Sequence, residues 1–203
     1  MNRMSGPRAD ILPWQSWRMS IDPEYDKVLV LPLLAGRTVV LRSFQPADAP
    51  MIQESSRDPL IPLITTVPSD NSVDAALAFI ERQHNRLQSH AGYSFAIADE
   101  NDIAVGQIGL WLRDEDHGRA SIGYWIRPSA RQRGYAADAL VAIVAWARTL
   151  PNLHRLELCV EPWNEGSWRA AEKAGFQREG LLRAWQRVGG VHRDMFMYSL
   201  LTQ

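Results

Sequence analysis

The sequence is poor in cysteine, in net charge and in long apolar stretches, and each shortage excludes a class of protein. Its single cysteine, Cys159, rules out an intrachain disulfide framework and a zinc cluster built from several cysteines, and it suits a reducing compartment. The 22 lysines and arginines nearly cancel the 23 aspartates and glutamates, so no global field attracts nucleic acid. The longest apolar stretch, at 139–147, is far shorter than the roughly 20 residues that span a bilayer. We therefore expect a cytoplasmic protein with no nucleic-acid or membrane partner.

The length of the chain fits one domain. Its 203 residues are close to the size of a typical single domain, and we expect residues 33–203 to form it. Residues 1–32 are expected to be a partly ordered extension, without the apolar segment of a signal peptide. Trp14 and Trp17 are large and apolar for a solvated tail, so we expect them to pack on the domain or on the second subunit of a homodimer.

Periodicity predicts a mixed α/β fold. Val73, Leu77, Ile80, His84 and Leu87 recur every three or four residues, which predicts an amphipathic helix over 72–89. Further helices are expected after Pro46, over 136–147 and over 164–175, and strands at 38–44, 93–98, 103–112, 119–126 and 156–160, with a last hairpin at 189–190. Antiparallel strands followed by one strand–helix–strand crossover make a mostly antiparallel mixed sheet flanked by helices.

One segment carries a clear chemical signal. The stretch 126–137 reads as a strand that ends in a glycine-containing turn and opens directly into a helix. The first N–H groups of a helix have no intrahelical acceptor and lie at the positive end of its dipole, so they can hold a pyrophosphate. Gly134 allows close approach of the backbone, Arg131 and Arg133 add positive charge at the rim, and Ala136 keeps the first turn slim.

Three segments in this order resemble the GNAT superfamily of acyl-CoA-dependent N-acetyltransferases, and within it the RimJ/RimL type that acetylates ribosomal proteins. They are the opening strand Gly36-Arg37-Thr38-Val39-Val40-Leu41-Arg42, the loop Arg131-Gln132-Arg133-Gly134-Tyr135-Ala136, and Asn164-Glu165-Gly166-Ser167 followed by Glu172-Lys173-Ala174-Gly175-Phe176. The resemblance covers about four fifths of the chain. It implies the GNAT fold, in which the strand ending at Ile126 and the strand at 156–160 splay apart.

The resemblance also implies the cosubstrate acetyl-CoA, no metal, and a primary amine as acceptor, either a protein N-terminal α-amine or a small molecule. The loop from Arg131 to Ala136 would hold the pyrophosphate. The backbone of Ile126 and Arg127 and the amide of Asn164 would bind the pantetheine arm, which acts as an extra strand in the splayed gap. Asn164 is also a plausible helix N-cap, and the two roles are compatible.

The implied reaction is direct attack of a neutral amine on the thioester. Many family members carry a tyrosine before Glu-Lys in the second motif, but this chain has Ala171 there. Ser167, which matches a serine of the RimJ/RimL type, is therefore the candidate donor to the leaving thiolate, unless it only satisfies the first helical turn. Glu157 or Glu161 is the candidate base, directly or through a water, or else an ordinary salt-bridged residue. Some relatives carry a carboxylate where this chain has Cys159.

Acceptor contacts are expected from 59–67, from the helix after Ser72 and from the last hairpin. Asp114, Glu115 and Asp116 either attract a cationic amine or form a solvated turn, and Trp111, Trp125, Trp163 and Trp185 either line the acceptor slot or pack in the core. Two alternatives stay open: a non-catalytic acyl-CoA-binding regulator, and a transferase for another acyl group such as succinyl. A nucleotide-binding module is a third, although the sequence lacks the P-loop and Gly-x-Gly-x-x-Gly patterns.

Overall fold

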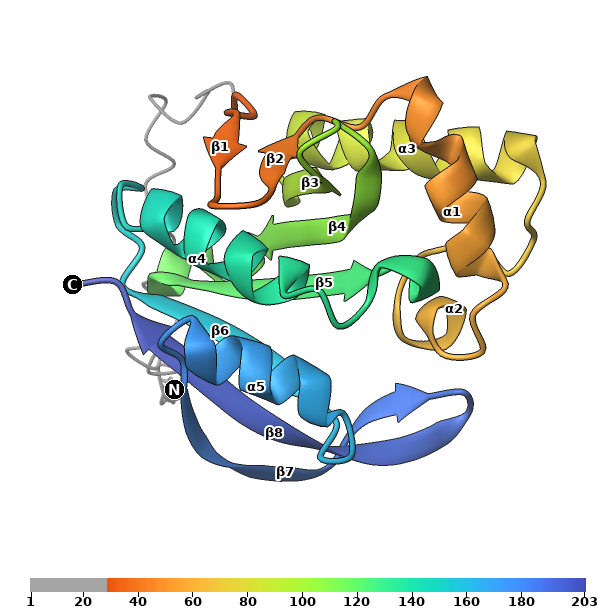
Figure 1. The fold of residues 1–203 in the computed structure, drawn as a ribbon. Coiled ribbons are helices and arrows are strands. Elements are labelled where there is room, and N and C mark those ends of the chain that lie inside the picture. Colours follow the sequence, from red (N-terminus) through yellow and green to blue (C-terminus); the bar gives the residue numbers. More distant parts are fainter. Residues whose placement is uncertain (1–28) are drawn as a thin grey trace, which may run out of the picture.

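A computed structural model of the protein describes residues 29–203 (Figure 1). Most of the expected extension at 1–32, with Trp14 and Trp17, therefore lies outside the described residues. The strands are β1 (Leu34–Ala35), β2 (Val40–Arg42), β3 (Gly92–Ala98), β4 (Ala104–Trp111), β5 (Arg119–Ile126), β6 (Arg155–Val160), β7 (Gln177–Val188) and β8 (Val191–Leu201). The helices are α1 (Ala49–Ser56), α2 (Ile61–Ile64), α3 (Val73–Gln88), α4 (Tyr135–Ala147) and α5 (Glu165–Lys173), with short 3-10 turns η2 (Pro46–Asp48), η3 (Glu115–His117) and η4 (Pro128–Ala130).

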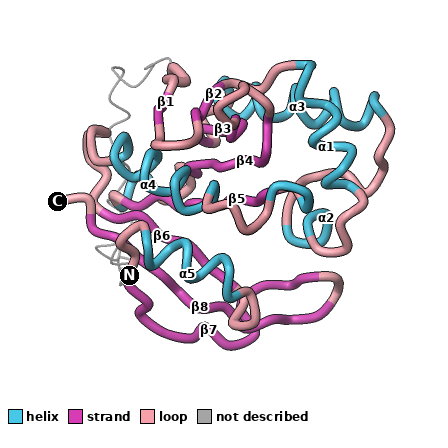
Figure 2. Tube along the Cα trace, in the orientation of Figure 1, coloured by secondary structure: helices cyan, strands magenta, loops and turns pink. Residues whose placement is uncertain are grey.

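The eight strands form one sheet in the order β1-β2-β3-β4-β5-β6-β8-β7 (Figure 2). The neighbouring strands are antiparallel except β5 and β6, which are joined through the crossover helix α4 and run parallel. This confirms the mixed α/β sheet expected from the sequence, including its single parallel pair.

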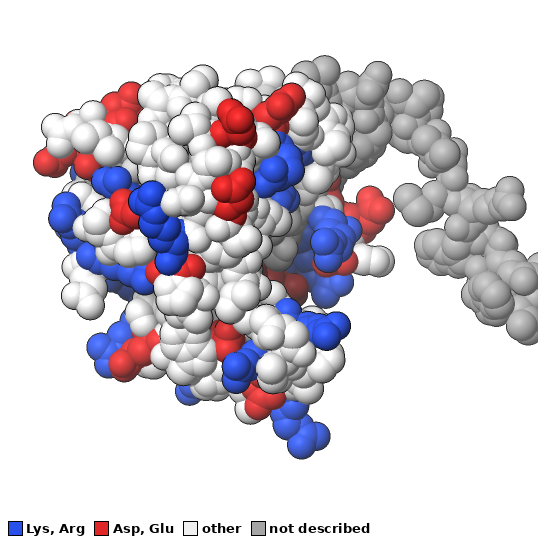
Figure 3. Space-filling view, turned by 90° about the vertical axis from the view of Figure 1, so that its right-hand side faces the viewer, with Lys and Arg blue, Asp and Glu red and all other residues white. Residues whose placement is uncertain are grey.

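The sheet is covered on both faces. On β3, Phe95 and Ile97 belong to the larger core under α4 and α5, whereas Ala96 between them belongs to the smaller core under α1 and α3. Because successive strand residues point to opposite faces, these helices form two separate layers. Figure 3 shows that positive and negative side chains are interspersed over the face it presents.

The inward face of α3 differs from the expected one. The structure buries Ala76, Phe79, Ile80 and Gln83, while Val73 and Leu77 stay 53% and 39% exposed and His84 is also exposed. The face is rotated because Phe79 packs edge-on against Phe44 and Trp125, and because the polar Gln83 is satisfied inside the core. A buried glutamine at the centre of the apolar face hid the true periodicity.

The parallel pair is short, and this shapes the site. β5 and β6 pair only from Arg119–Arg155 to Ser121–Glu157, and the two strands then diverge (Figure 1). The splay implied by the family resemblance is therefore present. Because of this splay, β5 beyond Ser121 has no strand neighbour on the side of β6, and this part of β5 leads into the loop where α4 begins.

Candidate functional site

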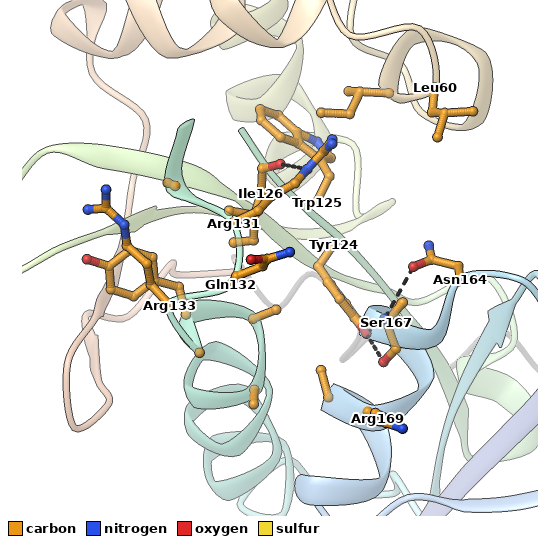
Figure 4. Close-up of a pocket in the computed structure, with 18 of the residues that line it drawn as sticks. Leu60, Tyr124, Trp125, Ile126, Arg131, Gln132, Arg133, Asn164, Ser167 and Arg169 are labelled. Atoms are coloured by element: carbon orange, nitrogen blue, oxygen red, sulfur yellow. Dashed lines mark hydrogen bonds between the residues drawn. The ribbon is translucent and has the colours of Figure 1, made fainter. Parts of the chain in front are cut away.

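A cavity of about 510 Å³ opens where β5 leaves β6 (Figure 4). Its walls come from α2, the end of β5, the loop into α4, the first turn of α4, and one side of α5. The lining residues are Leu60, Ile61, Ile64, Tyr124, Trp125, Ile126, Ala130, Arg131, Gln132, Arg133, Gly134, Tyr135, Ala136, Ala137, Trp163, Asn164, Gly166, Ser167, Arg169, Ala170 and Lys173. The structure thus gathers most of the expected ligand-binding residues around one space.

The loop into α4 presents unpaired backbone donors to this cavity. Gly134 is the N-cap of α4 with φ +81, and no side chain caps the helix start. The first intrahelical bond is donated by Asp138 to the Gly134 carbonyl at 3.1 Å, so the amides of residues 135–137 precede it without an intrahelical acceptor. No atom lies within 4 Å of a Cβ placed on Gly134, which leaves room for an anion to approach the backbone.

The two loop arginines both line the cavity, and they differ in how firmly they are held. Arg131 is tied down: its Nη2 lies 2.7 Å from Asp58 Oδ2, and its Nε donates to the carbonyl of Ile126 at 3.2 Å. Arg133 is exposed and donates to the Ser129 carbonyl at 3.4 Å. Arg131 therefore joins the loop to the segment between α1 and α2, and Arg133 is the freer of the two charges.

The environment of Asp58 stabilises its charged form, in which it pairs with Arg131. Burial by itself raises the pKa of this carboxyl group, but bonds from the Ile61 and Leu60 amides and the charge of Arg131 outweigh it, so the pKa lies below the usual value. A second carboxylate makes a similar link, because Glu54 accepts from the Ser129 amide at 2.8 Å and from its hydroxyl at 3.0 Å. Two carboxylates of the α1–α2 segment therefore bind the stretch 129–131 that leads into α4.

The backbone at the end of β5 favours Ile126 over Arg127 as a ligand donor. The Arg127 amide already donates to the Val105 carbonyl of β4 at 2.9 Å, and its side chain lies 3.4 Å from Glu54, outside the cavity lining. Since amides alternate in direction along an antiparallel strand, the Ile126 amide faces the splayed gap. The expected backbone role of Arg127 is therefore not supported by its geometry.

The first turn of α5 carries Asn164 and Ser167. Asn164 is the N-cap, and its Oδ1 accepts from the Ser167 amide at 3.2 Å, which leaves the carboxamide nitrogen for other contacts. Ser167 Oγ lies 2.8 Å from the phenol oxygen of Tyr124 on β5. Tyr124 was not among the residues expected at the site, although it shares one face of the strand with the inward residues Ile122 and Ile126. Burial raises the pKa of Tyr124 to about 12, so the phenol is neutral at physiological pH.

The two candidate bases lie outside the cavity lining. Glu157 Oε1 is 2.6 Å from Arg155 Nε, so its carboxylate is already engaged. Glu161 is buried, and its Oε2 accepts from the indole nitrogen of Trp163 at 2.7 Å. Trp163 lines the cavity, so Glu161 contacts a residue of the cavity wall without lining the cavity itself.

The four tryptophans expected at an acceptor slot fall into two groups. Trp125 and Trp163 line it, whereas Trp111 lies across Gly109 and Gly123, and Trp185 is 59% exposed on β7. The acidic turn at 114–116 does not reach the lining. Within residues 29–203 no cluster of three or more histidine, cysteine or acidic side chains is arranged to hold a metal, and no helix there is long and apolar enough to cross a membrane.

A buried polar network holds Trp125 in place and was not anticipated from the sequence. Its indole nitrogen donates to Gln107 Oε1 at 2.7 Å, and Gln107 Nε2 donates to Gln83 at 2.9 Å and to Ser94 at 2.8 Å. All four side chains are buried between α3 and the sheet. A network whose members satisfy one another is rigid, so one wall of the cavity is fixed.

Comparisons with known proteins agree with this geometry. The sequence profile of the acetyltransferase (GNAT) domain matches residues 38–177. The uncharacterized N-acetyltransferase p20 of Bacillus licheniformis is 30% identical over 164 residues, which cover 80% of this chain and 92% of that protein. The putative ribosomal N-acetyltransferase YdaF of Bacillus subtilis is 34% identical over 96 residues, covering 47% and 52%. Mycobacterium smegmatis RimJ, solved in complex with CoA-disulfide, superposes with a TM-score of 0.72 at 24% identity, covering 84% and 86%.

Proposed function

The chain belongs to the acetyltransferase (GNAT) family and is an N-acetyltransferase, and we propose that it uses acetyl-CoA to acetylate the N-terminal α-amine of a protein. Residues 33–203 would form the whole catalytic domain, working in the cytoplasm. The observation that carries the choice of acceptor is the charge of the cavity lining, whose charged side chains Arg131, Arg133, Arg169 and Lys173 are cationic beside apolar and aromatic residues. A polyamine needs carboxylates to match its charges, whereas an α-amine that attacks in its neutral form fits apolar and aromatic walls.

The donor side is assigned residue by residue. The amides of residues 135–137 would hold the pyrophosphate, with Arg133, Gln132 and Gly134 around it. The pantetheine arm would lie in the gap beside β5, bonded to the Asn164 carboxamide, so that its thioester carbonyl reaches the Ile126 amide. These groups line one continuous cavity, which supports the assignment.

The chemistry follows from this placement. The amine nitrogen forms a bond to the thioester carbon, whose oxygen is polarised by the Ile126 amide, and the carbon–sulfur bond breaks with its electron pair going to sulfur. Ser167 donates a hydrogen bond to the resulting thiolate. The proton lost by the amine passes to Glu161 through a water, or to Glu157, with Glu161 favoured by its closeness to the cavity wall.

The first test is ligand binding to the purified protein. Acetyl-CoA, succinyl-CoA and CoA should raise the melting temperature while ATP and NAD should not, because a ligand that binds the folded state stabilises it. A larger shift and turnover with succinyl-CoA would redirect the acyl assignment. ATP or NAD binding in preference to CoA would point to a nucleotide-binding module.

The second test identifies the acceptor. N-terminal peptides of ribosomal proteins, the same peptides blocked at the N-terminus but carrying an internal lysine, and spermidine are compared by CoA release and mass spectrometry. Acetylation of the free α-amine alone is expected. Turnover of spermidine in preference to the peptides would refute the acceptor proposal, and CoA binding without turnover of any amine would favour a regulatory protein.

A further inference from the structure

The middle of β5 and the first turn of α5 meet through one pair of hydroxyl groups. Tyr124 Oη lies 2.8 Å from Ser167 Oγ and 2.9 Å from the backbone carbonyl oxygen of Ser167 (Figure 4). Both residues line the cavity, although 43 positions separate them in the sequence. Under the proposed function, on which this inference rests, the thioester is broken beside this pair.

The splay of the sheet is what brings the two together. Pairing between β5 and β6 stops at Ser121, so β5 continues alone through Tyr124. The phenol extends from β5 across the opened gap and reaches α5, the helix that follows β6. A tyrosine at this position can therefore support the helix side of the gap from the strand side.

The number of protons decides what the phenol can do. The Ser167 carbonyl only accepts, and a helical carbonyl at this position is already served by the amide four residues later. If the phenol donates to that carbonyl, the serine proton must point back at the phenol oxygen. If the phenol donates to Ser167 Oγ, the serine proton is released toward the cavity, and its donor strength increases because hydrogen bonds in a chain polarise one another.

We propose that Tyr124 is a positioning residue, whose phenol donates to Ser167 Oγ and turns the serine proton toward the departing thiolate. The switch between the two arrangements needs only a rotation of two hydroxyl groups. It takes place when negative charge develops on sulfur, so its benefit is larger in the transition state than in the ground state.

Tyr124 does not act as a general acid in this scheme. The pKa of Tyr124 is raised to about 12 by burial, whereas an ordinary thiol has a pKa of about 8.5, so full proton transfer from the phenol to the thiolate is unfavourable. The sulfur leaves as a thiolate that accepts a hydrogen bond from Ser167, and it takes its proton from water afterwards. The proton lost by the amine goes to the base, so the step is balanced without a proton from the phenol.

The experiment uses the full chain and the variants Tyr124→Phe, Ser167→Ala and the double variant, with Tyr93→Phe as the control. Tyr93 is another buried tyrosine, on β3, packed edge-on against Trp146 and not among the residues that line the cavity. Tyr124→Phe keeps the ring and should lower the single-turnover rate about tenfold, the value of one hydrogen bond, while the CoA dissociation constant changes less than twofold. Tyr93→Phe should leave the rate unchanged.

The double variant separates this inference from the proposed function. In the Ser167→Ala background, Tyr124→Phe should have no further effect, because the phenol acts through the serine. Multiplied effects, or a normal rate for Tyr124→Phe beside a slow Ser167→Ala, would overturn the role of Tyr124 alone. A normal rate for Ser167→Ala would remove the serine from the proposed function, and a wild-type protein without turnover would refute the function itself.

A second measurement tests the same proposal if the Tyr124→Phe variant folds poorly. Site-specific replacement of Tyr124 by 3,5-difluorotyrosine keeps the hydroxyl and lowers its pKa. The rate should then fall with rising pH as the phenol ionises and ceases to donate, whereas the wild-type rate should not fall in the same range. A pH profile identical to that of the wild type would contradict the proposal.

Discussion

Replacing Gly134 by alanine is the sharpest perturbation of the donor site. The residue has φ +81, and the added methyl group would meet no protein atom within 4 Å. Its cost to folding is therefore backbone strain alone, about 1–2 kcal/mol for a non-glycine residue in the left-handed region, or a fall in melting temperature of about 2–8 °C for a domain of this size.

The effect on the ligand should be larger than this strain. The methyl group occupies the space through which a pyrophosphate approaches the amides of α4, and a charge-assisted hydrogen bond to such a ligand contributes about 1.5–3 kcal/mol. Loss of one such bond predicts that the CoA dissociation constant increases at least tenfold. Isothermal titration calorimetry with CoA measures it directly.

Gly190 provides a matched control at the turn between β7 and β8. It has φ +85 and equally open space around a Cβ, but it lies outside the cavity lining. Gly190→Ala should lose similar stability and keep its CoA affinity. If both variants bound CoA as the wild type does, the pyrophosphate would not lie at Gly134, and the donor-site assignment would be refuted.

Three further predictions concern the contacts around the site. Arg131→Met should raise the KM for the acceptor, because its bond to Asp58 is lost, and should change the CoA dissociation constant less than threefold. Arg133→Met is the reference for CoA binding. A loss of CoA affinity in Arg131→Met as large as in Arg133→Met would show that Arg131 binds phosphate. Gln107→Leu should lower the free energy of unfolding by about 3 kcal/mol, measured by urea titration, because it leaves the indole nitrogen of Trp125 buried without a partner, and an unchanged value would contradict the network. Asp138→Asn should lower the free energy of unfolding by about 2 kcal/mol at pH 7, because the carboxylate accepts hydrogen bonds from the amides of residues 37–39 and from the Thr38 hydroxyl. Burial by itself raises the pKa of Asp138, but these hydrogen bonds outweigh burial, and the pKa lies below its usual value. That stabilisation is complete above about pH 4 and is lost as pH falls through the lower folded pKa, so the variant's urea titrations should show a weaker acid dependence, and an equal one would refute this reasoning.

Local signals in the sequence were sufficient to place the elements that frame the cavity. The strand Arg119–Ile126, the N-cap at Asn164 and the Gly189-Gly190 hairpin occur where they were expected. Each depends on residues close together in the chain, such as an alternating strand pattern, a capping side chain or a pair of glycines in a turn. The glycine that opens α4 was also visible locally, although long-range bonds from Glu54 and Asp58 hold the loop before it.

The parts that were missed depend on residues far apart. The ion pair of Arg131 with Asp58 was not anticipated, because Asp58 lies 73 positions earlier and no local pattern links the two. Tyr124 and Ser167 are 43 positions apart, and attention to a tyrosine near Ala171 concealed the phenol that β5 supplies. Each contact exists only after the sheet and helices have packed, so only the three-dimensional structure reveals it.

The loop before α4 is held in shape by residues of the α1–α2 region. Gln132 and Gly134 have φ values of +63 and +81, and the left-handed region is costly for a glutamine. A strained loop keeps its shape when contacts with other segments outweigh the strain. Here Glu54 accepts a hydrogen bond from the Ser129 amide, and Asp58 forms an ion pair with Arg131. Both carboxylates belong to the α1–α2 region that leads into the apolar wall of the cavity. The proposed donor and acceptor sites therefore share one support, so a displacement of α2 by an acceptor would be transmitted to the loop that is proposed to hold the pyrophosphate.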